Sequence, residues 1–138
     1  MLQTSYRFKI RFSEVDAMQV VWHGSYVKYM EDAREAFGQE YGLSYQLYID
    51  SGYYAPIVDM RIQYHKPLRY GMIPEMTITY RPTDAAKIVF DYEIRDSVTD
   101  EVMITGHTIQ VFMDMNYNLV LLNPPFYEEW KGRVKGDM

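Results

Sequence analysis

The feature that most constrains the fold is a change of hydrophobic period near residue 26. From Tyr6 to Phe12, apolar and charged residues alternate, which is typical of a strand with one face in a core. From Tyr26 onward the apolar residues instead form one stripe of an amphipathic helix: Tyr26, Tyr29, Met30, Ala33, Phe37 and Tyr41. Gly42 is placed to end this helix. We therefore expect a strand followed by one long helix.

Alternation returns after a tyrosine-rich connection that ends at Pro56. It predicts strands over 58–64, 76–81, 88–95, 102–113 and 119–122. The turn signals at 82–85, 97–100 and 115–118 are short, so neighbouring strands should be antiparallel. Pro124 and Pro125 close the series, and a polar tail begins a helical turn at Phe126. The prediction is one α+β domain over 1–138, with a five- or six-stranded antiparallel sheet around the helix.

Composition excludes several classes of function. The chain has 138 residues, a net charge of −5 and no cysteine. The acidic balance makes nucleic acid an unsuitable partner, and the lack of cysteine removes disulfides, thiolate metal ligands and cysteine nucleophiles. The N-terminus has no apolar signal region, and no window approaches the roughly 20 apolar residues of a membrane span. We expect a soluble, cytoplasmic protein.

Common catalytic motifs are also missing. There is no GxSxG motif, and Ser25 reads as the N-cap of the predicted helix. His23, His65 and His107 lie far apart and show no metal-ligand spacing, and no glycine-rich loop could hold a phosphate. No metal and no cofactor are expected. His107 reads as an ordinary strand histidine.

Asp16 and His23 remain, just before the long helix. One interpretation is structural: Asp16 stabilises a turn, and His23 satisfies backbone groups at the helix start. The other is chemical, because the first turn of a helix presents unpaired N–H groups that can bind an oxyanion. A carboxylate beside such a site suits acyl transfer. The residues by themselves leave both interpretations open.

A resemblance favours the chemical interpretation. The run DAMQVVWHGSYVKYMEDARE (16–35), followed by PIVDMRIQYHKPLRYG (56–71), resembles the 4-hydroxybenzoyl-CoA thioesterase branch of the hotdog acyl-CoA thioesterases. The similarity covers nearly the whole chain. It implies a hotdog fold, an acyl-CoA substrate, no cofactor, and a homodimer or homotetramer with active sites between subunits.

Carried across by position, the resemblance assigns catalytic roles to Asp16 and His23. Asp16 would be the nucleophile or the general base, and Tyr26 would line the substrate site. Gln19 stands where the family pattern has glycine. If that position needs a positive φ, glutamine is strained there, although its amide could instead contact the substrate.

The turn around Pro67 supplies further candidates. Lys66 and Arg69 could meet the anionic nucleotide of CoA, or they could be ordinary surface charges. The leading function is hydrolysis of an acyl-CoA thioester to the free acid and CoA. Two rivals are a hotdog hydratase or dehydratase, and a non-catalytic module that binds acyl-CoA or acyl-carrier protein. The acyl group is left open.

Overall fold

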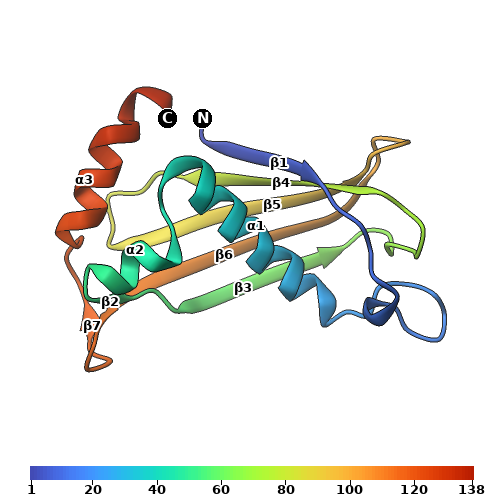
Figure 1. Cartoon of the computed structure of the whole chain (residues 1–138), viewed down its shortest axis with the longest axis horizontal. Coiled ribbons are helices and arrows are strands. Elements are labelled where there is room, and N and C mark those ends of the chain that lie inside the picture. The colour runs from blue at the N-terminus through green and yellow to red at the C-terminus, as the bar shows by residue number, and fades with distance from the viewer.

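One long helix crosses one face of an antiparallel sheet in the computed structural model, which describes residues 1–138 (Figure 1). The strands are β1 (Gln3–Arg7), β2 (Tyr53–Tyr54), β3 (Ile57–Tyr64), β4 (Pro74–Arg81), β5 (Lys87–Asp96), β6 (Val102–Asp114) and β7 (Leu119–Val120). The helices are α1 (Ser25–Tyr41), α2 (Tyr45–Asp50) and α3 (Pro125–Val134), with single 3₁₀ turns η1 (Phe12–Glu14) and η2 (Lys135–Asp137). This is the α+β architecture that the sequence predicts.

The sheet is built around β6. The strand order is β1-β4-β5-β6, and β3 pairs with the other side of β6 along the same residues that β5 uses. The short strands β2 and β7 also pair with β6, near its end. All pairings are antiparallel, as the short turns indicate. One edge of the sheet is therefore β1 and the other is β3.

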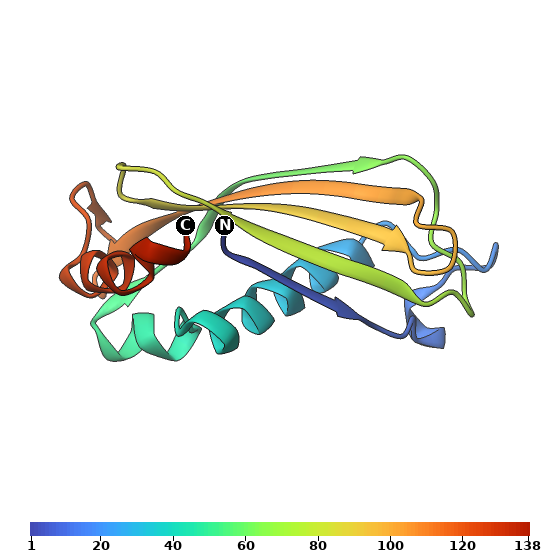
Figure 2. The same cartoon turned by 90° about the horizontal axis from the view of Figure 1, so that it is seen from above.

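The core lies between α1 and the inner face of the sheet. The helices lie on one side of the sheet, and its opposite face carries no covering layer (Figure 2). The apolar stripe of α1 is buried as the periodicity predicts, and the helix ends at Gly42 with φ of 75°. Phe37 is fully buried, and its ring packs against those of Tyr41, Tyr80, Phe90 and Trp130. Aromatic packing of this kind ties α1, the sheet and α3 together.

The first strand is displaced from its predicted position. The alternation over 6–12 predicts a strand there, whereas β1 covers Gln3–Arg7. Its partner β4 begins at Pro74, so the last ladder bond runs from the Phe8 N–H to the Pro74 carbonyl. Beyond Phe8 the chain finds no partner strand, although Ile10 still points into the core. The alternation marks the inward face as far as Ile10, whereas Phe12 is 77 % exposed, and the end of the strand depends on its partner β4.

Three other segments differ from the prediction. The tyrosine-rich connection contains α2. The Ser44 hydroxyl caps this helix by accepting a hydrogen bond from the Leu47 N–H at 3.1 Å. The last predicted strand shortens to Leu119–Val120. The tail forms the whole of α3, not one turn, because Trp130 and Tyr127 bury their rings against the core.

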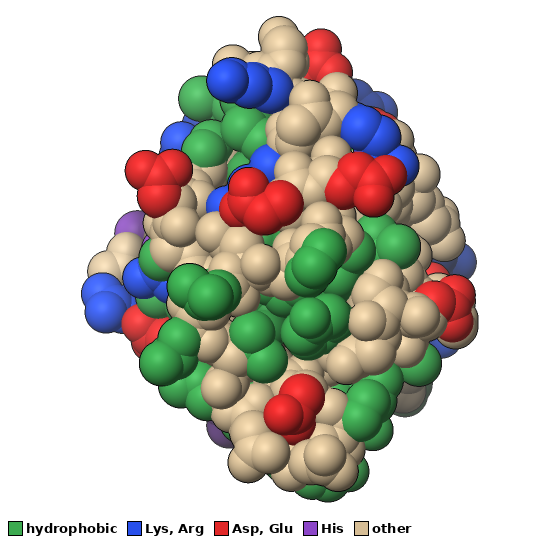
Figure 3. All heavy atoms as spheres, turned by 90° about the vertical axis from the view of Figure 1, so that its left-hand side faces the viewer, with side chains coloured by type: hydrophobic (Ala, Val, Ile, Leu, Met, Phe, Trp, Pro, Cys, Tyr) green, Lys and Arg blue, Asp and Glu red, His purple; other side chains and the backbone are tan.

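The end of the molecule formed by α2, β7 and α3 is notably apolar on its surface. Figure 3 looks onto this end and shows hydrophobic side chains gathered among acidic ones. Exposed apolar residues of these segments are Tyr45, Tyr117, Leu119, Leu121 and Leu122. None of the helices is both long and apolar enough to cross a membrane.

We predict that Phe37→Ala lowers the free energy of unfolding by about 3 to 5 kcal/mol, because it empties a fully enclosed aromatic site. The measurement is urea unfolding followed by circular dichroism. Val98→Ala, at a side chain 85 % exposed in the β5–β6 turn, is the control and should change the value by less than about 0.5 kcal/mol. Equal effects of the two changes would contradict this account of the core.

Candidate active site

A tight hairpin carries Asp16. Val15 and Val21 form an antiparallel bridge, the Asp16 N–H donates to the Val20 carbonyl at 2.9 Å, and the Gln19 N–H donates to the Asp16 carbonyl at 2.9 Å. This pairing matches a turn followed by one residue in the left-handed conformation. The backbone on both sides of the Asp16 side chain is therefore held by hydrogen bonds.

Gln19 adopts that left-handed conformation, with φ of 64°. This is the case in which the sequence analysis expects glutamine to be strained, and the positive φ is a conformation that suits glycine. The Gln19 carbonyl accepts a hydrogen bond from the Tyr70 N–H at 3.1 Å, which fastens the turn to the segment after Pro67. The glutamine side chain itself is exposed. Its strained backbone is therefore not offset by burial of the side chain.

Glu14 joins the hairpin to the start of α1. Its carbonyl accepts from the Trp22 N–H at 2.8 Å and from the Ser25 hydroxyl at 3.3 Å. Its carboxylate accepts from the Tyr29 hydroxyl at 2.9 Å and from the Arg11 N–H at 2.8 Å. Burial and this carboxylate raise the pKa of Tyr29, so the phenol remains a donor. The sequence reading missed Glu14, and its only signal was an acidic residue two positions before Asp16.

The start of α1 offers unpaired backbone donors. The N–H groups of His23, Gly24, Tyr26 and Val27 make no hydrogen bond, whereas that of Ser25 bonds the Trp22 carbonyl at 2.9 Å. Ser25 is not the N-cap that the sequence predicts; the N-cap is Gly24, because the Ser25 hydroxyl turns to Glu14. Gly24 allows the Trp22 ring to lie against the helix start, since a Cβ there would come within 2.1 Å of a ring carbon.

Asp16 and His23 flank this helix start differently. Asp16 is half-buried; its Oδ1 accepts from the Met18 N–H at 2.8 Å, and its Oδ2 makes no hydrogen bond. The turn role expected for Asp16 thus occupies one oxygen and leaves the other available. The His23 ring is exposed and packs on the Trp22 ring at 4.9 Å, without a hydrogen bond to Asp16.

The other predicted residues, Tyr26, Arg69 and Lys66, have different surroundings. Tyr26 is buried: its hydroxyl accepts from the Leu68 N–H at 3.3 Å and its ring packs against Tyr64 at 5.2 Å. Arg69 is bridged to Val20 and lines a hollow of 450 Å³ together with Gln19. Lys66 instead pairs with Glu101 at 2.6 Å and does not line that hollow.

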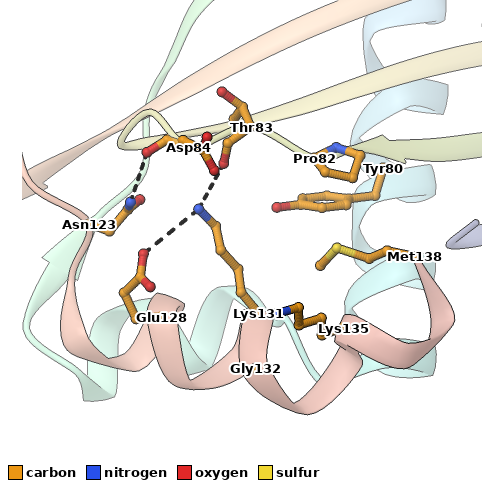
Figure 4. Close-up of a pocket in the computed structure, with 10 residues that line it drawn as sticks. All are labelled: Tyr80, Pro82, Thr83, Asp84, Asn123, Glu128, Lys131, Gly132, Lys135 and Met138. Carbon is orange, nitrogen blue, oxygen red and sulfur yellow. Dashed lines mark hydrogen bonds and ion pairs between the residues drawn. The ribbon is translucent and has the colours of Figure 1, made fainter.

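A separate cavity of 490 Å³ lies under α3 (Figure 4). Lys131 crosses it, donating to the Thr83 carbonyl at 2.9 Å, with Glu128 3.9 Å away. Asn123 donates to the Asp84 carbonyl at 3.1 Å. None of the hairpin and helix-start residues lines this cavity, and its Lys131 ammonium is already held by protein oxygens.

Comparison with known proteins identifies the family. Residues 10–131 match the model of the thioesterase-like superfamily, so the chain belongs to that family. It is 33 % identical over 86 residues to the putative acyl-CoA thioesterase YneP of Bacillus subtilis, a match that spans 62 % of each chain. The match therefore covers less than two thirds of that relative.

Solved structures agree on the fold. A DHNA-CoA thioesterase from Staphylococcus aureus superposes with a TM-score of 0.86 over 99 % of this chain and 93 % of that one, at 24 % identity. A 1,4-dihydroxy-2-naphthoyl-CoA thioesterase from Synechocystis gives a TM-score of 0.80 over 90 % of this chain and 92 % of that one, at 21 % identity. The chain has the hotdog fold, which confirms that part of the prediction.

We predict that Gln19→Gly raises the free energy of unfolding by about 0.5 to 1 kcal/mol, because glycine adopts a positive φ without steric cost. Gln19→Val should lower it by about 1 to 2 kcal/mol, since a β-branched residue tolerates this region poorly. Thermal and urea unfolding of both variants provide the measurement. A stabilising valine would show that the turn does not hold this backbone conformation.

Proposed function

We propose that the protein hydrolyses acyl-CoA thioesters, with Asp16 as nucleophile or general base and the start of α1 as the oxyanion site. One observation carries the proposal: a carboxylate with a free oxygen stands in a hairpin that Glu14 ties to a helix start whose N–H groups are unpaired. Donors aimed at a developing oxyanion contribute strongly to acyl transfer. The family supports thioester chemistry, and the position of Asp16 matches the resemblance to the 4-hydroxybenzoyl-CoA branch.

The reaction uses few groups. The thioester carbonyl would lie against the N–H groups near His23, while Asp16 either attacks the carbonyl carbon or removes a proton from an attacking water. If Asp16 attacks, the C–S bond breaks to leave an acyl–Asp16 anhydride, and water hydrolyses this anhydride to the free acid and restores the carboxylate. If water attacks, its oxygen becomes the hydroxyl of the free acid as the C–S bond breaks. On both routes the CoA sulfur takes up a proton and leaves as the thiol. His23 takes part through its backbone N–H, because its ring is exposed and unattached to Asp16.

For CoA, the arrangement favours Arg69 over Lys66. Arg69 shares a hollow with Gln19 beside the Asp16 turn, whereas the Lys66 ammonium is engaged by Glu101. A guanidinium can bind a phosphate through two parallel hydrogen bonds. Arg69 is therefore the proposed contact for the anionic nucleotide, and Lys66 is a weaker one.

We predict that Asp16→Asn lowers kcat by about 10²- to 10⁴-fold while the protein stays folded, because the amide can neither attack nor accept the proton. Thiol release is measured with short, long and aromatic acyl-CoAs. Asp96→Asn is the matched control, since Asp96 also caps a turn N–H, that of Val98, at 2.9 Å.

Turnover that collapses only in Asp16→Asn supports the mechanism. Turnover unchanged by this substitution would move the reaction to another site. Tight binding of acyl-CoA by the wild-type protein without turnover on any substrate would instead select the non-catalytic binding module. Hydration of an unsaturated acyl-CoA without thiol release would select the hydratase.

We also propose that two copies pair through β3. This strand bonds only β6, its outer edge is open over eight residues, and Val58 and Tyr64 are more than half exposed on it. An open strand edge is a natural site for pairing with a second chain. The other edge, β1, is shorter, with five residues.

The expected result of sedimentation equilibrium is a mass of two or four chains of 16.4 kDa. A proline at Ile62, near the middle of β3, should shift the mass toward one chain, because it removes an N–H that points away from β6 toward the open edge. Circular dichroism checks that the variant remains folded. A wild-type protein that sediments as one chain at all concentrations would contradict this pairing.

A further inference from the structure

The Glu14 side chain lies where the Asp16 hairpin meets α1. A single carboxylate oxygen, Oε1, accepts two hydrogen bonds, from the Tyr29 hydroxyl at 2.9 Å and from the Arg11 N–H at 2.8 Å. Tyr29 belongs to α1 and lies one turn after Ser25, the first residue of that helix. The Glu14 carboxylate therefore connects the beginning of α1 to the chain that leads into the hairpin.

The Tyr29 partner in this connection is itself held in place. Its side chain is buried, and its ring packs against those of Phe8 at 4.8 Å and Tyr26 at 6.0 Å. Because the ring is fixed by this packing, its hydroxyl presents its proton at one place. The Glu14 carboxylate is thus held at a set position relative to α1.

The pleat of the hairpin relates Glu14 to Asp16. Val15, between them, has an extended backbone with φ of −106° and ψ of 155°, and it forms an antiparallel bridge with Val21. Side chains two positions apart in an extended, paired segment point to the same face. The Glu14 and Asp16 side chains therefore share one face of the hairpin, and Val15 lies on the opposite face.

Trp22 shows where that face points. Its N–H donates to the Glu14 carbonyl at 2.8 Å, so Trp22 lies opposite Glu14 in the antiparallel pairing and shares its face. The Trp22 ring lies over Gly24, the N-cap of α1, because a Cβ there would come within 2.1 Å of a ring carbon. The face that carries Asp16 is thus turned toward the start of α1.

We infer that Glu14 and Tyr29 are positioning residues for the thioesterase reaction, because their hydrogen bond sets the Asp16 carboxylate against the unpaired N–H groups of α1. This inference rests on the proposed function. In this arrangement Glu14 neither contacts the substrate nor exchanges a proton with it; what matters is an oxygen acceptor at the position of Oε1. A misplacement of about 1 Å in a catalytic group can cost about 10²-fold in rate.

The kinetic experiment removes the acceptor and then restores it without the charge. Glu14→Ala should lower kcat for thiol release by about tenfold to a hundredfold, with KM changed by less than about twofold. Glu14→Gln should keep kcat within about threefold of wild type, because its amide oxygen can accept the same two hydrogen bonds. Tyr29→Phe should lower kcat by the same route, and combining it with Glu14→Ala should cause no further loss.

Glu40→Ala is the matched control. The Glu40 carboxylate also accepts from a hydroxyl, that of Thr4 at 3.1 Å, but it connects the other end of α1 to β1. Its loss should lower the midpoint of urea unfolding while kcat stays within about twofold of wild type. A loss of kcat in Glu40→Ala as large as in Glu14→Ala would overturn the inference. So would an equal loss in Glu14→Gln, since the charge would then be the requirement.

Backbone amide exchange followed by NMR separates this inference from the thioesterase itself, because it needs no turnover. The Asp16 and Trp22 N–H groups, which close the hairpin, should exchange about tenfold faster in Glu14→Ala and at the wild-type rate in Glu14→Gln and Glu40→Ala. Unchanged exchange in Glu14→Ala overturns the inference whether or not thiol is released. Faster exchange in a protein that releases no thiol would support the Glu14 connection and contradict the proposed function alone.

Discussion

The packing of α1 against one face of the sheet is the contact on which the rest of the structure depends. Phe37 stands at its centre and joins the helix, the sheet and α3 through aromatic rings. Because the helix lies across the strands, its start lies at the Tyr64 end of β3, whereas its last turn reaches β1, where the Tyr41 hydroxyl donates to the Gln3 carbonyl at 2.8 Å (Figure 1). The start of α1 and the Asp16 hairpin that Glu14 ties to it are therefore positioned by this apolar contact.

The Asp16 hairpin shows how a strained turn is held in place. Gln19 occupies a left-handed conformation, and three backbone hydrogen bonds around it keep the turn closed. Glu14 then ties this turn to the helix start through both its carbonyl and its carboxylate. Such over-determination is what allows backbone strain to persist in a folded protein. It also connects the hairpin that carries Asp16 to a helix start whose donors have no partner of their own.

Much of the site was predictable because its residues are close together in the sequence. Asp16 and His23 lie within one short segment of the chain, and the apolar periodicity that begins at Tyr26 predicts where the following helix starts. The separation of Lys66 from Arg69 was not predictable, since it depends on Glu101 from the far side of the β5–β6 turn.

By itself, the sequence determined the periods of the chain: which residues face the core, that α1 is helical, and that the later strands are antiparallel. These properties are local, since they follow from side-chain spacing and turn length. Only the tertiary structure decided where β1 ends, that α2 and α3 are helices, and that Ser25 bonds Glu14 instead of capping its helix. In each case a hydrogen bond or a buried ring meets a partner that local spacing does not specify: Pro74 for the end of β1, Phe126 for Tyr48 of α2, Tyr80 for Trp130 of α3, and Glu14 for Ser25.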